Sequence, residues 1–296
     1  MNYRDRILDR LAAARVWGYH ADQPAASEPT ATAALALSCA GRDAAARAAL
    51  DWLVRVQGKD GSVGVTATEA LPAWPTALAV LAFAAAGNRY DGRRQLGVDH
   101  LLSIRGTPVD RNEQMGHDST LVGWPWVLPT HSWSEPTALA LLALRAAGHG
   151  RHPRADEATR LLVDRLLPAG GSNYGNTRVL NQMLRPHVMP TGVVLWALAD
   201  RQAADSRIGL SLDFLTTELE VPTSAVALGY SVLALAAHGR DLGVARRAYQ
   251  EVAARHLQQP AASPWKLAVL ALAALEMEPS SSLRRPTQVI AEGASS

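Results

Sequence analysis

The chain has 296 residues, of which 48% are hydrophobic and 19% are charged. These proportions are typical of a globular protein, and the length suits one large domain or two small ones. The formal net charge is +2 and the sequence contains no run of Lys or Arg, so nothing in it indicates nucleic-acid binding. The single cysteine, Cys39, rules out an internal disulfide and a cysteine-rich zinc site.

Two kinds of helix are expected to alternate along the chain. Segments with charge on one stripe and Leu or Val on another occur at 5–16, 42–57, 93–104, 154–167, 206–219 and 241–257. Each of them is paired with a following segment that is apolar nearly all round, at 27–37, 74–83, 134–144, 189–198, 221–230 and 263–272. A helix of the first kind has one wet face, whereas a helix of the second kind must be buried.

The apolar segments share a repeated phrase, seen as SEPTATAALAL at 27–37, WPTALAVLAF at 74–83 and SEPTALALLAL at 134–144. Its proline suits a first helical turn, where the backbone N–H has no helical partner. Six amphipathic helices around six buried ones predict an all-α fold, a closed (α/α)6 toroid of six hairpins with inner and outer rings. Uneven repeat lengths and the lack of polar capping repeats favour this toroid over an open solenoid.

Residues 1–278 are expected to form a single toroid domain, and residues 279–296 a flexible C-terminal tail without helical periodicity. The sequence opens on an amphipathic segment rather than a leader peptide. No apolar segment reaches the roughly 20 residues that a membrane span needs. We therefore expect a cytoplasmic protein, with peripheral membrane contact and the oligomeric state left open.

The lengths of the connections predict which end of the toroid carries the function. Three connections into the buried helices are long, at 58–74, 106–135 and 168–189, compared with a usual median of about 4 to 6 residues. They share the end at which six helix N-termini, and therefore the positive ends of six helix dipoles, converge. A ligand-binding site is expected at this end.

Aromatic and polar residues in and near these connections are the candidate substrate-binding residues. An aromatic-lined pocket can hold an apolar substrate or stabilise a carbocation, although the indoles could equally form a lid and the asparagines turns. The candidates are Trp74, Trp124, Trp126, Trp133, Asn173, Tyr174, Arg178, Arg185, His187 and, within the fourth buried helix, Trp196.

The repeats resemble those of the squalene cyclase and protein prenyltransferase superfamily. The resemblance extends from about Tyr19 to Leu275 and rests on the Pro-Thr-Ala-Leu-Ala phrase and on QGKDGSVG at 57–64, in which Val63 stands where tryptophan is usual. It implies a toroid around a hydrophobic cavity for an isoprenoid. The zinc site of the prenyltransferase branch is not expected, because Cys39 has no aspartate two residues away; neither a metal nor a cofactor is predicted.

Class II terpene cyclases of this superfamily protonate an alkene or epoxide with the middle aspartate of an Asp-x-Asp-Asp-Thr-Ala stretch. The similar stretch here is Trp-Ser-Glu-Pro-Thr-Ala at 133–138, which implies Glu135 as the proton donor without its two acidic neighbours. A glutamate at a helix N-terminus ionises at neutral pH unless a dry pocket raises its pKa. His131 or His117 would be its hydrogen-bonding partner.

Glu28 occupies the equivalent point of the first repeat. In a hexagon of inner helices about 9 to 10 Å apart, the first and third positions lie roughly 16 Å apart, which is too far for two carboxyls to share a proton. Both glutamates also fit a simpler role, as acidic residues in a helix-capping sequence.

Three functions compete. The first is a terpene cyclase-like protein that binds a linear isoprenoid in an aromatic-lined central cavity and cyclises it by protonation. The second is a non-catalytic toroid that binds an isoprenoid or lipid. The third is a carbohydrate-active (α/α)6 enzyme with Trp124 or Trp126 as a sugar platform, which would need Asp118 or Glu113 as a second carboxylate.

Overall fold

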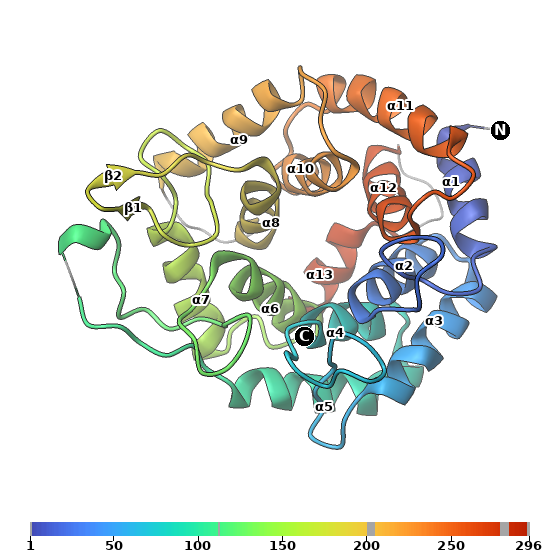
Figure 1. The fold of residues 1–296 in the computed structure, drawn as a ribbon, viewed down its shortest axis with the longest axis horizontal. Helices are drawn as coiled ribbons and strands as arrows, with labels where there is room; N and C mark the ends of the chain where they lie inside the picture. Colours follow the sequence, from blue (N-terminus) through green and yellow to red (C-terminus); the bar gives the residue numbers. More distant parts are fainter. Residues whose placement is uncertain (1, 112, 200–204, 279–283, 295–296) are drawn as a thin grey trace.

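The computed structural model describes residues 2–111, 113–199, 205–278 and 284–294. Helices of these residues form two concentric rings (Figure 1). The outer ring contains α1 (Tyr3–Ala12), α3 (Asp43–Val56), α5 (Asp91–Ser103), α7 (Pro153–Asp164), α9 (Ser206–Glu218) and α11 (Gly243–Gln258). The inner ring contains α2 (Ser27–Cys39), α4 (Thr76–Ala85), α6 (Ser134–Ala146), α8 (Val188–Leu198), α10 (Ala225–Ala237) and α12 (Pro264–Met277). The predicted all-α toroid is confirmed.

The ring closes because the first and last hairpins meet. Helix α12 packs against α2 and α1, and α1 also contacts α11. The Arg10 guanidinium donates a hydrogen bond to the carbonyl oxygen of Leu257 at 3.1 Å, and the Ser263 hydroxyl donates to the carbonyl oxygen of Tyr19 at 2.5 Å. Each inner helix therefore has two inner neighbours, which an open solenoid would not provide for its terminal helices.

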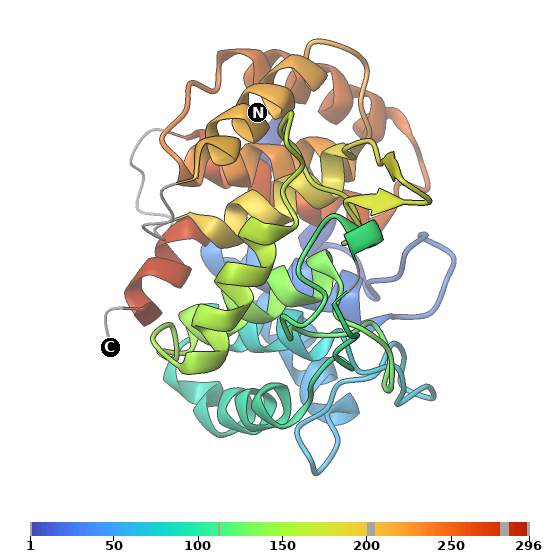
Figure 2. The same cartoon turned by 90° about the vertical axis from the view of Figure 1, so that its left-hand side faces the viewer.

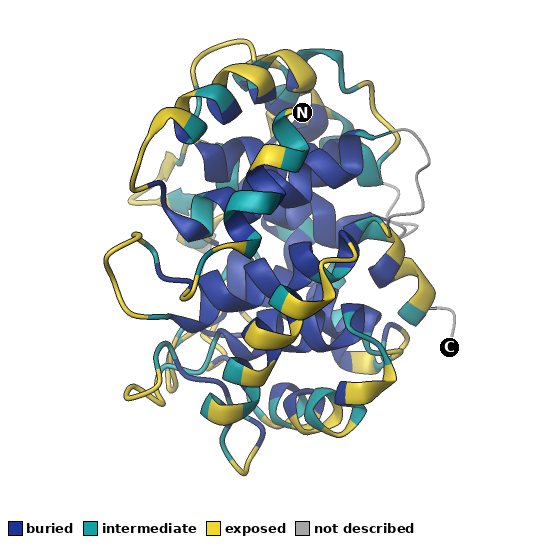
Figure 3. Cartoon of the chain, turned by 90° about the vertical axis from the view of Figure 1, so that its right-hand side faces the viewer, coloured by how far each residue is buried: buried dark blue, intermediate teal, exposed yellow. Residues whose placement is uncertain are grey.

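The inner helices are buried over their whole circumference, as their composition predicts. Every residue of α4 and of α6 is buried, and Figure 3 shows buried inner helices surrounded by outer helices with an exposed outward face. Small residues allow the inner helices to approach one another closely. A Cβ atom on Gly229 of α10, for example, would lie 2.1 Å from Val269 Cγ1 of α12.

The threonine of the repeated phrase attaches the preceding loop to the inner helix. In three repeats the threonine Oγ1 accepts a hydrogen bond from a loop N–H at 2.8 to 3.0 Å; the pairs are Thr76 with Val63, Thr137 with Trp124, and Thr191 with Ser172. All of these threonines are fully buried. The phrase thus fixes three loops at the same end of the ring.

The element at 57–64 attaches its loop to the next outer helix. Gln57 is buried, and its Nε2 donates hydrogen bonds to the carbonyl oxygens of Gly61 at 3.2 Å and Arg93 at 3.0 Å. Gly61 has a φ of +84°, and a Cβ atom there would lie 1.9 Å from the carbonyl oxygen of Leu96. The segment at 57–64 therefore has a structural role, which is to hold its loop against α5.

Two features of the loops were not expected from the sequence. Strands β1 (Arg178–Val179) and β2 (Gln182–Met183) form an antiparallel hairpin whose turn residues, Leu180 and Asn181, have φ values of 48° and 62°. Two short 3-10 helices, η1 (Asn88–Tyr90) and η2 (Glu113–Met115), lie in other connections.

The fifth inner helix begins at Ala225 rather than at Pro222, because the Ser224 side chain caps it by accepting a hydrogen bond from Ala227 N.

Residues 286–294 of the predicted tail form a helix that packs on the ring, whereas the flexibility of the tail stays a prediction. Helix α13 (Pro286–Ala294) contacts α6, α12, α4, α10 and α2, and it buries Val289 and Ile290. It lies on the face of the ring opposite the β1–β2 hairpin (Figure 2). The apolar pair allows α13 to cover the C-terminal end of the inner ring. The domain boundary at residue 278 stays a prediction.

No helix in the described ranges combines the length and the apolar character that crossing a membrane would require.

Candidate functional site

Two buried glutamates lie at the end of the inner ring that carries the long loops. Glu28 and Glu135 are the second residues of α2 and α6, and their exposed fractions are 7% and 5%. The Tyr19 hydroxyl donates a hydrogen bond to Glu28 Oε2 at 2.6 Å. Within the described ranges, no residue donates a hydrogen bond to the Glu135 carboxyl. The two acids thus occupy equivalent places in their repeats but have different partners.

Burial holds both carboxyls away from water and raises their pKa values. The pKa of Glu135 rises to about 8, chiefly through burial and also through the nearby charge of Glu28. The pKa of Glu28 rises to about 7 through burial, and the hydrogen bond from Tyr19 opposes part of this rise. Burial and the charges of both acids raise the pKa of the Tyr230 phenol as well. These four side chains form one electrostatic cluster, here called the acid cluster.

The two glutamates are coupled through their charges, although the described structure contains no hydrogen bond between their carboxyls. The prediction that they lie too far apart to share a proton stays a prediction. The charge of Glu28 acts on Glu135, and the charges of both acids act on Tyr19 and Tyr230. Two interacting groups of this kind titrate as a pair. Near neutral pH the pair therefore holds at least one proton, which a dry carboxylic acid can donate.

Aromatic pairs line the same end of the ring. Trp74 lies immediately before the repeat proline, as Glu28 and Glu135 do, and its helix α4 packs between α2 and α6. Its ring makes an edge contact with Trp126, with centroids 4.9 Å apart. Tyr19 makes a similar contact with Trp265 at 5.3 Å. A partly exposed aromatic pair therefore lies between the repeats of the two acids.

Two tryptophans predicted to bind substrate are part of the framework instead. Trp124 is 1% exposed, its Nε1 donates to the carbonyl oxygen of Leu101 at 2.8 Å, and the Arg154 guanidinium lies 4.1 Å from its ring centroid. Its ring is therefore covered and its one donor is used. Trp196 is 2% exposed and contacts Tyr230, with ring centroids 6.4 Å apart. Trp196 is thus buried in the inner ring, where it packs against Tyr230 of the acid cluster.

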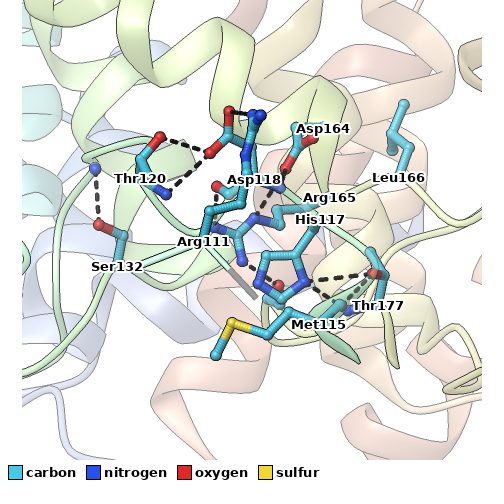
Figure 4. Close-up of polar contacts among 12 residues, drawn as sticks. Arg111, Met115, His117, Asp118, Thr120, Ser132, Asp164, Arg165, Leu166 and Thr177 are labelled. Carbon is cyan, nitrogen blue, oxygen red and sulfur yellow. Dashed lines mark hydrogen bonds and ion pairs between the residues drawn. The ribbon is translucent and has the colours of Figure 1, made fainter. Parts of the chain in front are cut away.

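Asp118 organises the loop at 106–133 (Figure 4). Its Oδ1 accepts hydrogen bonds from the Thr120 N–H and hydroxyl, and its other oxygen pairs with Arg111. These contacts, the Thr120 hydroxyl first, lower the pKa of Asp118 to about 2. The Asp118 N–H donates to Asp164 at 2.9 Å, and its carbonyl oxygen accepts from Arg165 at 3.2 Å. Both oxygens of the Asp118 carboxylate are therefore occupied by partners from its own loop.

Neither predicted histidine partner hydrogen-bonds to Glu135. His117 Nδ1 lies 3.3 Å from Thr177 Oγ1, and burial together with the charge of Arg165 lowers its pKa to about 4 (Figure 4). His131 is exposed and stacks on Trp133, with ring centroids 4.6 Å apart. Burial lowers the pKa of His131 too. The contacts of both rings are thus with other loop residues, and their role as partners of Glu135 stays a prediction.

The loop at 168–189 makes one backbone hydrogen bond to the start of α6, the helix that carries Glu135. The Tyr174 carbonyl oxygen accepts a hydrogen bond from Ser134 N at 3.1 Å, at the start of α6. The Tyr174 ring, which is exposed, lies 5.2 Å from the ring of His187. Asn173 is buried and makes a turn, since its Oδ1 accepts from Gly175 N at 3.0 Å, while its Nδ2 has no hydrogen-bond partner.

The basic residues of this loop do not join the acid cluster. Arg178 lies on β1, and Arg185 is exposed after the hairpin. Neither contributes to the pKa shifts of Glu28 or Glu135. The side chain of Glu113, the other carboxylate considered for sugar chemistry, lies outside the described set.

A cavity of about 120 Å³ lies between the two long loops. Its lining includes His117, His131, Ser132, Arg165 and Asn176. This volume suits a small polar group and is well below the roughly 300 to 1,000 Å³ of typical ligand pockets. No group of three or more metal-ligating side chains occurs in the part of the chain that the structure describes.

Sequence reasoning missed Tyr19, Tyr230 and Trp265. Tyr19 follows α1 in an irregular segment, and Tyr230 lies in a helix that is apolar throughout. Their positions become meaningful only when ring closure brings the first, third, fifth and sixth hairpins together. The polar character of Tyr230 within an otherwise apolar helix was the one local signal.

Comparison with known proteins shows the fold. No family model matches the sequence, and no curated protein matches it significantly. A structure described as a novel alpha-amylase from Clostridium perfringens aligns with a TM-score of 0.66 and 9% identity, over 94% of this chain and 98% of that one. A protein from Actinoplanes aligns with a TM-score of 0.54 and 16% identity, over 87% and 80% of the two chains.

An ent-copalyl diphosphate synthase from Streptomyces platensis aligns with a TM-score of 0.53 and 17% identity. The alignment covers 90% of this chain and 50% of the synthase. This chain is an α/α toroid. At these identities the similarity extends to the fold alone, and the fold carries more than one chemistry.

Proposed function

We propose that the protein is a terpene cyclase-like enzyme in which Glu135 protonates a linear isoprenoid. The observation that carries the proposal is the state of Glu135, a buried carboxyl whose pKa of about 8 keeps it protonated at neutral pH. Protonation of an alkene requires a group that still holds its proton at the working pH, and exclusion of water keeps the proton on Glu135. The aromatic rings of Trp74 and Trp126 would stabilise the carbocation.

The proposed reaction conserves protons. The O–H bond of Glu135 breaks and its proton forms a C–H bond with an alkene carbon, leaving a carbocation that a second double bond attacks. Loss of a proton from the cyclised cation to the Glu28 carboxylate restores a double bond. Transfer of that proton to Glu135 completes the cycle, so the overall reaction is an isomerisation.

The size of the site sets a condition on this proposal. The cavity of about 120 Å³ between the long loops does not accommodate a whole isoprenoid, and its lining does not include Glu135, Trp74 or Trp126. A substrate must therefore displace part of the loop at 106–133, whose exposed residues include Val127 and Leu128. Loop opening and closure of this kind is common in enzymes that exclude water during reaction.

The test combines ligand identification with turnover. Small molecules extracted from the purified protein would be identified by mass spectrometry, and the protein would be incubated in D2O with farnesol, geranylgeraniol and squalene. A cyclised product carrying one solvent deuterium is expected. Glu135→Gln should abolish its formation, whereas Glu69→Gln, which removes an exposed carboxyl from the loop at 58–74, should not. Turnover retained in Glu135→Gln would remove Glu135 from the catalytic role.

Sugar hydrolysis is the second candidate, and the coupled acids favour it. A pair of carboxylates with unequal pKa values is what glycoside hydrolysis uses, and the alpha-amylase from Clostridium perfringens has a similar fold. Here the pair would be Glu135 and Glu28 rather than Glu135 and Asp118. Release of reducing sugar from soluble starch, lost in both Glu→Gln variants, would support this reading over the cyclase.

A further inference from the structure

Arg165 is a buried cation at the point where two long loops meet. It directly follows α7 and is 5% exposed. Its guanidinium donates hydrogen bonds to the carbonyl oxygen of Gly175, in the loop at 168–189, at 2.8 Å and to that of Asp118, in the loop at 106–133, at 3.2 Å (Figure 4). Burial lowers the pKa of Arg165 to about 10, so the group is charged at neutral pH.

The folded chain does not use all the donors of this guanidinium. An arginine has five N–H groups, four of them on the two terminal nitrogens. Two terminal N–H groups bond to the loop carbonyls. The Nε has no hydrogen-bond partner and lies 3.4 Å from Asp164 Oδ2, which accepts from the Asp118 N–H at 2.9 Å. Two terminal N–H groups of Arg165 are therefore left for a further acceptor.

Arg207, on the next outer helix, shows a guanidinium that is fully paired with a carboxylate. Its Nε and Nη2 donate to the two oxygens of Asp205 at 3.0 and 2.8 Å, and its Nη1 donates to the carbonyl oxygen of Leu166 at 2.7 Å. Bidentate pairing of this kind is the strong form of the arginine–carboxylate contact. The chain supplies no such hydrogen-bonded carboxylate to Arg165 within the described ranges.

The cavity of about 120 Å³ between the long loops lies against this guanidinium. Arg165 lines it together with polar and apolar side chains of both loops, among them Val109, His117, Leu121, Ser132 and Asn176. Asp118 and Asp164 lie outside the lining, which contains no carboxylate among the described residues. His117 adds no second charge at neutral pH, because burial and the charge of Arg165 lower its pKa to about 4.

The size and lining of the cavity select one chemical class of ligand. Its volume is about four times the share of one water molecule in the liquid, roughly 30 Å³, so it holds about four to six heavy atoms. A carboxylate matches the single charge and the planar fork of Arg165. A short alkyl end suits Val109 and Leu121. A phosphate group fits less well, because it carries nearly twice that charge at pH 7 and has no apolar end.

We propose that this cavity binds a short-chain organic carboxylate, with Arg165 as its charge partner and the Asn176 amide as a second hydrogen-bond donor. The site is separate from the proposed active site, since its lining includes none of Glu135, Trp74 and Trp126. A carboxylate in the cavity contacts both long loops and holds them together at this end of the ring.

Titration calorimetry with a matched pair of ligands tests the role of the charge. Propionate and propionamide have nearly the same shape, but only propionate is charged. In a buffer free of carboxylates and phosphate at pH 7, propionate should bind the wild-type protein at least about 10-fold more tightly, because charge-assisted hydrogen bonds are the stronger ones. Equal affinities, no binding of propionate, or tighter binding of inorganic phosphate would each overturn the proposal.

Variants locate the site. Asn176→Ala should weaken propionate binding about 10-fold, whereas Asn88→Ala, which removes an exposed amide from η1, should bind as the wild type does. Arg165→Met should abolish binding. Because Arg165 also holds two loop carbonyls, the ligand pair and Asn176→Ala keep the test decisive where this variant fails to fold. Undiminished binding in Asn176→Ala would contradict the site.

Glu135→Gln separates this site from the proposed reaction. The variant should bind propionate as the wild type does while it loses turnover. Propionate binding without isoprenoid turnover in the wild type would contradict the proposed reaction alone. Turnover without propionate binding would contradict the carboxylate site alone.

Discussion

The Tyr19 hydroxyl donates a 2.6 Å hydrogen bond to Glu28, so a residue outside every helix holds one of the two buried acids. Glu135, at the equivalent position of the third repeat, has no such donor among the described residues. A hydrogen bond to a carboxylate favours its ionised form and opposes the effect of burial. Tyr19 thus makes two sequence-equivalent glutamates chemically different.

Replacing Tyr19 should remove that difference. In Tyr19→Phe the hydrogen bond is lost while the ring contact with Trp265 can persist, so the pKa of Glu28 should rise. Carbon-13 NMR of the glutamate carboxyls as a function of pH would show an upward shift for one group. An unchanged titration of Glu28 would contradict the role given to Tyr19. Tyr174→Phe, on the exposed loop, is the control.

The stability of the protein should fall as the pH rises from about 6.5 to about 8, above the range in which the histidines with lowered pKa values have the opposite effect. The folded pKa values of Glu28 and Glu135 lie above the ordinary glutamate value, so the folded state binds more protons than the unfolded state in this range. Each carboxyl lowers the free energy of unfolding by about 1.4 kcal/mol per pH unit at most. Urea unfolding at several pH values measures this slope. The double variant Glu28→Gln/Glu135→Gln should have a much flatter profile.

Alanine variants of Trp124 and Trp126 should distinguish a residue needed for stability from one needed for ligand binding. Trp124→Ala removes a covered ring and its hydrogen bond, and it should cost about 3 to 5 kcal/mol of unfolding free energy. Trp126→Ala removes a half-buried ring that contacts Trp74, and it should chiefly weaken ligand binding. Thermal unfolding and the isoprenoid turnover assay on both variants check the distinction. Equal stability losses would mean that Trp126 is also part of the framework.

Gly61→Ala should destabilise the fold by about 2 to 4 kcal/mol, because the new Cβ meets the Leu96 carbonyl oxygen and the residue has a positive φ. Gly92 is the matched control. It lies in the first turn of α5 with no atom within 4 Å of a built Cβ, and Gly92→Ala should be neutral or slightly stabilising. Chemical unfolding of the two variants measures the difference, and similar values would contradict the argument.

The sequence predicted the two rings well because helix periodicity is a local property. The buried phrase identified all six inner helices, although the helix after Pro222 begins three residues later than the proline suggests. Side-chain chemistry was harder to predict. Nothing in the spacing of Asp118 showed that Thr120 and Arg111 would occupy its oxygens, and the coupling of Glu28 to Glu135 depends on the packing of α2, α4 and α6.

The contact between Ser263 and Tyr19 links the site to the two ends of the ring. Tyr19, which holds Glu28, is itself held by Ser263 and Trp265 of the last hairpin. Ribosomes make that hairpin more than 200 residues after Tyr19. The hydrogen bond from Tyr19 to Glu28 therefore depends on contacts that only the last hairpin supplies. A chain arrested before that hairpin is made would carry both glutamates without these contacts, so the titration of Glu28 would report whether the ring has closed.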